Sequence, residues 1–200
     1  MHAARRILVT VVALCTLVSF GPAALAGEAV DNRVRNGGFE RPEITEPFRQ
    51  ATGTDIPRWT ITGCVDLVSE PTFEAARGDQ SVDLNGSVGG TGCAANARGA
   101  ISQSIDTDAN QDYLLRFFLA GNPGCTESAA AKVKVVDVYW DGVLVATFRY
   151  DTAGQTAANI NWQLRVLELR AKNGDTLLEF RSANGGNCGP MIDAVRVTEA

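Results

Sequence analysis

The sequence consists of short apolar segments separated by turn residues, and no long segment shows helical periodicity. Alternation of apolar and polar residues, as in "QSVDLNG", is typical of a strand with one buried face. Asp141-Gly142 predicts a two-residue hairpin turn, and Asn173-Gly174 predicts a second hairpin. The alternation slips at Val166-Leu167, which indicates a β-bulge. About ten segments of this kind predict an all-β chain that folds as a single antiparallel β-sandwich, a jelly roll.

The first residues, "MHAARRILVTVVALCTLVSFGPAALA", form a segment apart. Two arginines precede an apolar run that leads to the small-residue motif Ala24-Leu25-Ala26, so we expect residues 1–26 to be a secretory signal peptide. A transmembrane anchor is the alternative, but the run is short and Gly21-Pro22 follows it. Cleavage would leave residues 27–200 as one domain that is secreted, extracellular and free of the membrane.

Histidine content and charge exclude several functions for residues 27–200. The only histidine, His2, lies in the predicted signal peptide, which excludes Ser-His-Asp and Cys-His nucleophiles and histidine-bound zinc or copper. The 18 Lys and Arg residues less Arg5 and Arg6 leave 16 cations against 23 acids, a net charge of −7. A net negative chain lacks the basic surface of a nucleic-acid-binding protein.

Four cysteines remain after cleavage: Cys64, Cys93, Cys125 and Cys188. An even number in an exported chain predicts two disulfides, and the sequence permits three pairings. Free buried thiols are one alternative, and a tetrathiolate zinc site is another. The wide spacings and the exported context argue against zinc.

Eight blocks occur in order between Arg35 and Val197: "NGGFERP", "IPRWTITGCVDLV", "GDQSVDLNG", "GAISQSIDT", "YLLRFFLAGNPGC", "NW", "TLLEFRS" and "CGPMIDAVRV". Their order and spacing resemble the bacterial choice-of-anchor C family, related to plant cell-wall proteins built on the domain of unknown function 642. The resemblance implies a bacterial protein with a galactose-binding-like jelly roll, related to carbohydrate-binding modules. Members often have Gly at the position of Arg58 and Asn at that of Ala194. Many carry a C-terminal surface anchor, which this sequence lacks, so we expect release.

Asp193 shares a predicted strand face with Met191, Val195 and Val197, where an unpaired carboxylate would cost several kcal/mol. In galactose-binding-like jelly rolls, a Gly-Phe-Glu near the first strand and an aspartate in the last strand hold one structural calcium. The resemblance therefore implies a Ca²⁺ site at Glu40 and Asp193, with backbone carbonyls completing the ~6–8 oxygen ligands. A salt bridge or a hydrogen-bonded carboxylate is the main alternative, and a catalytic acid is less favoured.

The resemblance also implies that the loops of Cys125 and Cys188 are neighbours, which pairs Cys125 with Cys188 and Cys64 with Cys93. For ligand binding, the polar row of "QSVDLNG" is the kind of surface that hydrogen-bonds sugar hydroxyls, and aromatic side chains beside the Asp141-Gly142 turn are candidates for stacking. An ordinary solvated face or an internal polar network is the alternative for that row. The candidate ligand-binding residues are Asp83, Asn85, Gln103, Asn122, Tyr139 and Trp140.

These expectations favour a secreted, non-catalytic module that binds cell-wall or extracellular polysaccharide. One alternative is a carbohydrate-active enzyme that uses two carboxylates, for which Asp66, Asp83 and Asp137 are candidates. Another is a protein-interaction module that docks on a secreted enzyme. The hypothesis of a binding module assigns no catalytic residue, and Ca²⁺ is the one expected cofactor.

Overall fold

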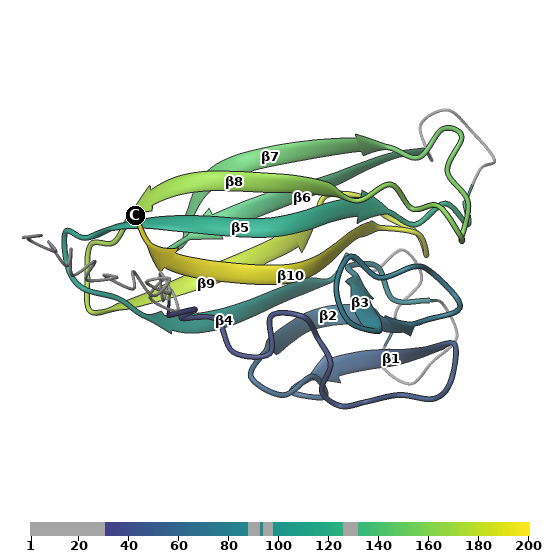
Figure 1. The fold of residues 1–200 in the computed structure, drawn as a ribbon, viewed down its shortest axis with the longest axis horizontal. Coiled ribbons are helices and arrows are strands. Elements are labelled where there is room, and N and C mark those ends of the chain that lie inside the picture. Colours follow the sequence, from purple (N-terminus) through teal and green to yellow (C-terminus); the bar gives the residue numbers. More distant parts are fainter. Residues whose placement is uncertain (1–30, 88–92, 94–97, 126–131) are drawn as a thin grey trace, which may run out of the picture.

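The computed structural model describes residues 31–87, 93, 98–125 and 132–200, so the predicted signal peptide lies outside the described residues. The described residues form ten strands (Figure 1). They are β1 (Phe48–Gly53), β2 (Thr60–Ser69), β3 (Gln80–Asp83), β4 (Ala100–Asp106), β5 (Asp112–Gly121), β6 (Val133–Trp140), β7 (Val143–Asp151), β8 (Gln163–Arg170), β9 (Asp175–Ser182) and β10 (Pro190–Glu199). Among these residues there is no helix with the length and hydropathy needed to cross a membrane.

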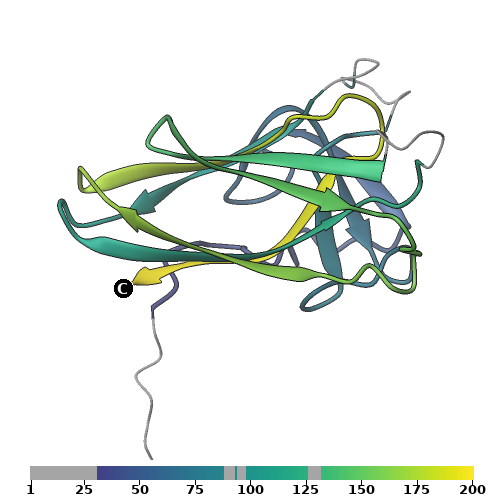
Figure 2. The same ribbon diagram turned by 90° about the horizontal axis from the view of Figure 1, so that it is seen from above.

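The strands pair in the order β7-β6-β9-β4-β2-β3-β10-β5-β8, and β1 pairs with β2 at the side of this path. All pairs are antiparallel. Figures 1 and 2 show that the sheet curls into two layers, with β5, β8 and β10 in one and β4, β6, β7 and β9 in the other. The expected single antiparallel β-sandwich is thereby confirmed.

The long strand β2 connects the two layers. Its first residues pair with β4 and its last residues pair with β3. Aromatic side chains fill the space between the layers: Phe117 on β5 meets Phe180 on β9 edge-to-face, with ring centroids 4.9 Å apart. Both rings are fully buried, and burial of each contributes about 1.5–3 kcal/mol to folding.

Of the two predicted hairpins, one is correct. Asp141 and Gly142 have positive φ angles of 53° and 74°, the geometry that a two-residue turn between β6 and β7 requires. The prediction at Asn173-Gly174 is wrong, because β8 pairs with β5 whereas β9 pairs with β4 and β6. The chain does turn there, but it crosses from one layer to the other instead of continuing a sheet.

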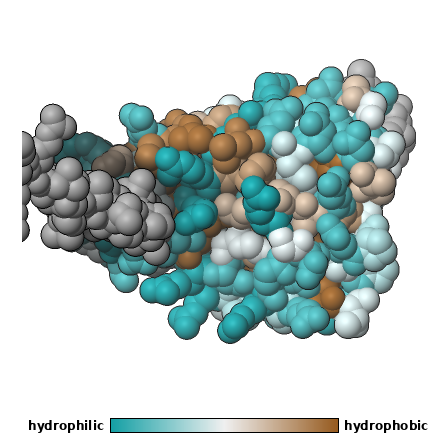
Figure 3. Space-filling view, viewed as in Figure 1, coloured by the Kyte–Doolittle hydropathy of each residue, from teal (hydrophilic) through white to brown (hydrophobic). Residues whose placement is uncertain are grey.

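The predicted bulge at Val166-Leu167 is also wrong, because β8 pairs with β5 without interruption. Leu164 and Val166 instead face solvent, with exposed fractions of 51% and 46%. A group of hydrophobic side chains is visible on this side of the molecule (Figure 3). The apparent slip in alternation therefore reflects apolar residues on the outer face of an edge strand.

Candidate functional site

The central feature of the site is a pair of aspartates on neighbouring strands. The register of β2 and β3 places Asp66 directly opposite Asp83, so both side chains lie on one face. Asp83 is fully buried, and its Oδ1 accepts hydrogen bonds from the main-chain N–H groups of Asn85 and Gly189, both at 2.9 Å. Its Oδ2 accepts one from Asn122 Nδ2 at 2.7 Å. Burial is the main cause that raises the pKa of Asp83 to about 7, and the charge of Asp66 adds to it.

The structure thus brings together three of the predicted ligand-binding residues, but not as a surface row. Asp83 and Asn85 are fully buried, so the polar face of "QSVDLNG" points into the protein. The Asn85 side chain donates to the carbonyls of Asn184 and Gly186 at 3.2 and 2.8 Å, and thereby holds the loop before β10. The polar row of this segment is therefore an internal polar network, the alternative to a ligand-binding surface.

Two buried acceptors in this network have no hydrogen-bond partner among the described residues: Asp66 Oδ1 and Asn85 Oδ1. The other Asp66 oxygen, Oδ2, accepts from the Ser87 N–H at 3.0 Å and from the Ser87 hydroxyl at 2.5 Å. Burial raises the pKa of Asp66, and the bonds from Ser87 oppose that shift. One oxygen of Asp66 therefore receives no hydrogen bond from the described residues.

A cavity of about 250 Å³ opens above Asp66, and we call it the Phe48 pocket. Two phenylalanines border it: Phe48 on β1 is 45% exposed, and Phe73 is partly buried against the core. The polar atoms around the cavity come from loops at the ends of β2, β5 and β3 and from the loop before β10. The lining residues are Phe48, Asp66, Val68, Thr72, Phe73, Ser87, Asn122, Gly124, Asn187 and Cys188.

Both disulfides expected from the resemblance are present, Cys64–Cys93 and Cys125–Cys188. The second lies at the pocket and joins the loop after β5 to the loop before β10. The Lys134 ammonium donates to the Cys188 carbonyl at 2.8 Å and supports the same corner from β6. The disulfide thus holds the loops of Asn122 and Asn187 together.

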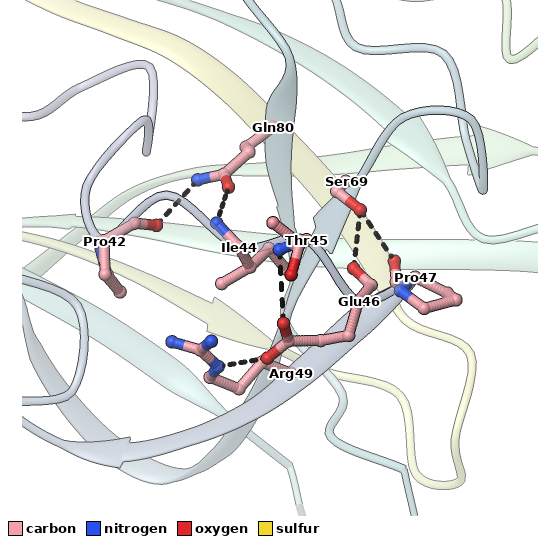
Figure 4. A network of polar contacts seen from close by, with 8 residues as sticks. All are labelled: Pro42, Ile44, Thr45, Glu46, Pro47, Arg49, Ser69 and Gln80. Atoms are coloured by element: carbon pink, nitrogen blue, oxygen red, sulfur yellow. Dashed lines mark hydrogen bonds and ion pairs between the residues drawn. The ribbon is translucent and has the colours of Figure 1, made fainter.

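A second network positions the segment that leads to Phe48 (Figure 4). Gln80 is 2% exposed; its Oε1 accepts from the Ile44 N–H at 2.7 Å, and its Nε2 donates to the carbonyls of Phe39 and Pro42 at 2.6 and 3.0 Å. At the end of β2, the Ser69 hydroxyl donates to the Glu46 carbonyl at 2.7 Å. Strand β1 therefore starts from a segment that is fixed to β2 and β3.

The other predicted ligand-binding residues lie away from the Phe48 pocket. Trp140 is no exposed platform: it is 5% exposed, and its indole N–H donates to the Arg170 carbonyl at 3.1 Å. Gln103 is 7% exposed and bonds to both the N–H and the carbonyl of Arg35, at 2.7 and 2.8 Å. Both side chains are therefore committed to the fold.

Tyr139 lines a separate cavity of about 530 Å³ on the outer face of β6 and β9. The Arg181 guanidinium lies over its ring, 4.2 Å from the centroid, and Glu179 holds that guanidinium with bonds of 2.6 and 2.8 Å. The ring face that a sugar would need is covered, so this cavity does not offer the stacking surface predicted for Tyr139.

The predicted calcium ligands Glu40 and Asp193 both bond to the segment between β2 and β3. Glu40 Oε1 accepts from the N–H groups of Asp79 and Gln80 at 3.1 and 3.3 Å, and Asp193 Oδ2 accepts from the Arg77 N–H at 2.8 Å. Burial raises the pKa of both carboxyls, to about 7 for Asp193, where the charge of Glu40 contributes. The alternative of a hydrogen-bonded carboxylate is thus present for each residue.

The backbone around Asp193 shows why Gly37 is needed. The Val195 N–H donates to the Gly37 carbonyl at 2.8 Å, and a Cβ on Gly37 would lie 2.1 Å from the Val195 carbonyl oxygen. Gly37 thus lets the N-terminal segment contact β10 directly. It is this contact that brings Glu40 toward the last strand.

Sequence reasoning considered Asp66 only as one of several acids and missed Phe48, Phe73 and Asn187. All three missed residues lie in segments without a strand pattern or at their edges. Their pairing in one pocket depends on loops that are far apart in the sequence. A signal for Asn187 was its position beside Cys188, because the disulfide places that loop next to Asn122.

Comparison with known proteins gives one family and several solved structures. A family model described as "Protein of unknown function (DUF642)" matches residues 32–198. No curated protein matches the chain. A family 35 carbohydrate-binding module from Clostridium thermocellum is 15% identical, with a TM-score of 0.47, covering 76% of this chain and 98% of that one. A second, from Paenibacillus barcinonensis, is 18% identical, with a TM-score of 0.45 and coverage of 76% and 98%.

A third solved structure, TmCBM61 in complex with β-1,4-galactotriose, is 19% identical, with a TM-score of 0.45, and covers 85% of this chain and 99% of that one. These likenesses concern the arrangement of the strands and identify no ligand for this chain.

Proposed function

This chain belongs to the DUF642 family of proteins of unknown function, and from that premise we propose that it is a non-catalytic carbohydrate-binding protein whose ligand occupies the Phe48 pocket. The ligand class is a cell-wall or extracellular polysaccharide. The proposal rests on the chemistry of the pocket and on no feature of the relatives.

The observation that carries the proposal is the unsatisfied oxygen of Asp66. A buried acceptor without a donor costs about 1–3 kcal/mol, and Asp66 Oδ1 is such an acceptor beside an open cavity. A sugar hydroxyl would supply the donor and form a charge-assisted hydrogen bond. Ser87 keeps the carboxylate in place through the other oxygen, so little ordering is required on binding.

The walls of the pocket suit a sugar ring. Sugar rings carry apolar C–H faces and polar edges, and small-molecule sites combine apolar walls with a few placed polar groups. Phe48 offers an exposed aromatic surface, and Asn122 and Asn187 carry amides beside it. Because Asn122 already bonds to Asp83 and to the Gly124 N–H, its orientation is set before binding.

The carboxylates support binding over hydrolysis. A glycosidase needs two carboxyl groups on either side of the bond that is cleaved, roughly 5–10 Å apart. Asp66 lines the pocket, but Asp83 lies below it, fully buried, with three hydrogen bonds from the protein. That arrangement uses Asp83 to hold Asn85, Asn122 and Gly189, and Asp66 is the one carboxylate among the residues that line the pocket.

The test is a glycan array followed by calorimetric titration of the best ligand. We expect Phe48→Ala to weaken binding about tenfold or more, because it removes the exposed aromatic surface, and Asp66→Asn to weaken it because the amide is a poorer acceptor. Leu164→Ala is the matched control, since its exposed fraction of 51% resembles the 45% of Phe48 but it lies on β8.

Absence of binding to any polysaccharide would overturn the proposal. Release of reducing ends, lost in Asp66→Asn, would favour the enzyme, and capture of one secreted enzyme without glycan binding would favour the interaction module. Each result therefore selects one function.

The location and finer family of the chain are part of the same proposal. The two disulfides support an oxidising compartment, in keeping with secretion to the extracellular space. We assign the chain to the bacterial choice-of-anchor C proteins on the order of its sequence blocks.

We also propose that Glu40 and Asp193 hold a structural Ca²⁺. Burial raises the pKa of both carboxyls, and the charge of Glu40 adds to the shift of Asp193, so a cation bound by the two would offset both effects. Each carboxylate has about four acceptor positions, so the N–H bonds from the loop leave room for a metal. When bound, Ca²⁺ would neutralise the pair and tie the N-terminal segment to β10.

A further inference from the structure

A third cavity, of about 340 Å³, also borders the loop between β2 and β3. Thr72 and Phe73 of this loop line the Phe48 pocket, whereas residues 74–77 line the third cavity. Its remaining lining residues come from β5 and from the segment before β8: Phe118, Asn159, Asn161 and Trp162. We call it the Trp162 pocket.

Hydrogen bonds between the two bordering segments organise the Trp162 pocket. The indole N–H of Trp162 donates to the Glu74 carbonyl at 2.8 Å, and the Glu74 N–H donates to the Ala157 carbonyl at 3.2 Å. The buried Tyr150 hydroxyl shares its single hydrogen between the carbonyls of Ile160 and Asn161, which lie at 2.7 and 2.8 Å. The aromatic and amide side chains are therefore presented by a fixed backbone, which lowers the entropic cost of binding.

The pocket also contains a cation, the guanidinium of Arg77. The Arg77 guanidinium lies over the ring of Phe118, with its carbon 5.8 Å from the centroid, and it has no ion pair among the described residues. The main-chain N–H of Arg77 bonds to Asp193, which fixes the base of the side chain. Stacking on Phe118 holds the guanidinium plane while its N–H groups stay free for a ligand.

The amides complete the donor set. Asn161 has a φ of 54°, a left-handed conformation that asparagine tolerates better than most residues. Asn159 and Asn161 are exposed, and their side-chain amides have no partner in the part of the chain that is described. Each amide both donates and accepts, as sugar hydroxyls require.

We infer that the Trp162 pocket is a second glycan-binding site, selective for a saccharide that carries a carboxylate. Trp162 offers aromatic surface to the ring, Asn159 and Asn161 bind its hydroxyls, and Arg77, supported by Phe118, binds the carboxylate through paired N–H groups. This inference is independent of the Phe48 pocket, which has no arginine or lysine among its lining residues.

Glu74 is the acidic residue on the rim, and it opposes an anionic ligand. Glu74 contributes to the structure of the pocket through its main chain, which bonds to Trp162 and to Ala157. The carboxylate is therefore dispensable for the geometry. Replacement by glutamine should leave the site formed and strengthen the binding of an acidic sugar.

The test uses tetrasaccharides of galacturonate and of mannuronate, each with its carboxylates free or methyl-esterified. Binding is followed by the indole N–H signals in ¹H–¹⁵N spectra. The indoles of Trp59 and Trp140 bond to carbonyls elsewhere and their rings are buried, so the Trp162 signal reports this pocket. We expect the free acids to shift that signal and to bind about tenfold more tightly than the esters at low salt, with the difference decreasing as salt rises.

Three variants test which charged side chain determines the affinity for the free acids. Arg77→Gln should reduce the affinity for the free acids to that for the esters, and Glu74→Gln should raise it. Arg149→Gln, an exposed arginine on β7, removes the same charge elsewhere and should change neither. Phe48→Ala should leave the shift of the Trp162 signal intact, which separates this site from the Phe48 pocket.

Equal affinity of acid and ester in the wild-type protein would overturn the inference. So would an equal loss in Arg77→Gln and Arg149→Gln, because it would show that net charge and not this guanidinium attracts the ligand. A free-acid response that disappears in Phe48→Ala would assign it to the first pocket instead.

Discussion

Asp66 on β2 lies directly opposite Asp83 on β3, and the two carboxyls share one buried face of the sheet. Asp83 receives three hydrogen bonds from the protein, while one oxygen of Asp66 receives none. The two acids therefore have different roles: Asp83 holds loops together, and Asp66 faces the pocket. The proximity of two carboxyls away from water makes the folded state sensitive to pH.

The pKa of Asp83 is raised from 3.8 to about 7, so the folded state favours its protonated form. The free energy of unfolding is therefore highest below the unfolded pKa, where Asp83 is protonated in both states. It decreases as pH rises toward the folded pKa, because the unfolded chain loses its proton first. We expect the Tm, measured in EDTA, to fall between about pH 4 and about pH 7. Asp83→Asn should make this fall smaller, because its amide stays neutral.

Asp106→Asn, at an exposed position on β4, is the control and should keep the wild-type fall in Tm. If Asp83→Asn and Asp106→Asn show the same fall, the buried carboxyl does not titrate in this range. Part of the wild-type fall belongs to Asp193, whose pKa is also raised to about 7.

Calcium should change the pH response of Asp193 and not that of Asp83. At about pH 8 both carboxyls of the Glu40 and Asp193 pair are charged, and Ca²⁺ would stabilise the folded state by binding them. We expect added Ca²⁺ to raise the Tm of the wild type and of Asp83→Asn, and to leave that of Asp193→Asn unchanged. A wild-type Tm that is the same in Ca²⁺ and in excess EDTA would remove the proposed metal site.

Seven described residues other than glycine have positive φ angles, the left-handed conformation that favours glycine, and they include Arg58, with a φ of 78°, and Ala194, with a φ of 48°. Ala194 lies in the register shift of β10 between Asp193 and Arg196. Replacing either by glycine should stabilise the fold by about 0.5–1 kcal/mol, because a residue with a Cβ atom is strained in this backbone conformation.

Ala146→Gly is the matched control for Ala194→Gly. Ala146 lies within β7 and is not among the residues with positive φ, so glycine there should destabilise by about 0.5–1 kcal/mol. Denaturant unfolding measures both. A loss of stability in Arg58→Gly and Ala194→Gly alike would contradict the strain assigned to these positions.

The disulfide at the pocket should contribute to stability and to ligand affinity together. Cys125–Cys188 closes a separation of 63 residues, worth about 4 kcal/mol in the chain-entropy model. We expect the double variant Cys125→Ala, Cys188→Ala to unfold at lower denaturant and to bind glycan more weakly. The corresponding Cys64 and Cys93 variant, whose disulfide does not line the Phe48 pocket, should lose stability with a smaller effect on binding.

The sequence by itself determined the strand content, the Asp141-Gly142 hairpin and the family. These properties depend on short-range signals: a two-residue period places side chains on alternating faces, and a turn with positive φ needs Gly, Asn or Asp.

Only the tertiary structure decided which strands pair and which polar residues are buried. The Asn173-Gly174 turn reverses the chain, but pairing of β8 with β5 and of β9 with β4 is set by how the layers pack. Burial likewise depends on both neighbours of a strand: β3 lies between β2 and β10, so Asp83 is enclosed although its sequence alternates like a surface strand. The Phe48 pocket combines loops distant in sequence, and short-range patterns carry no information about such contacts.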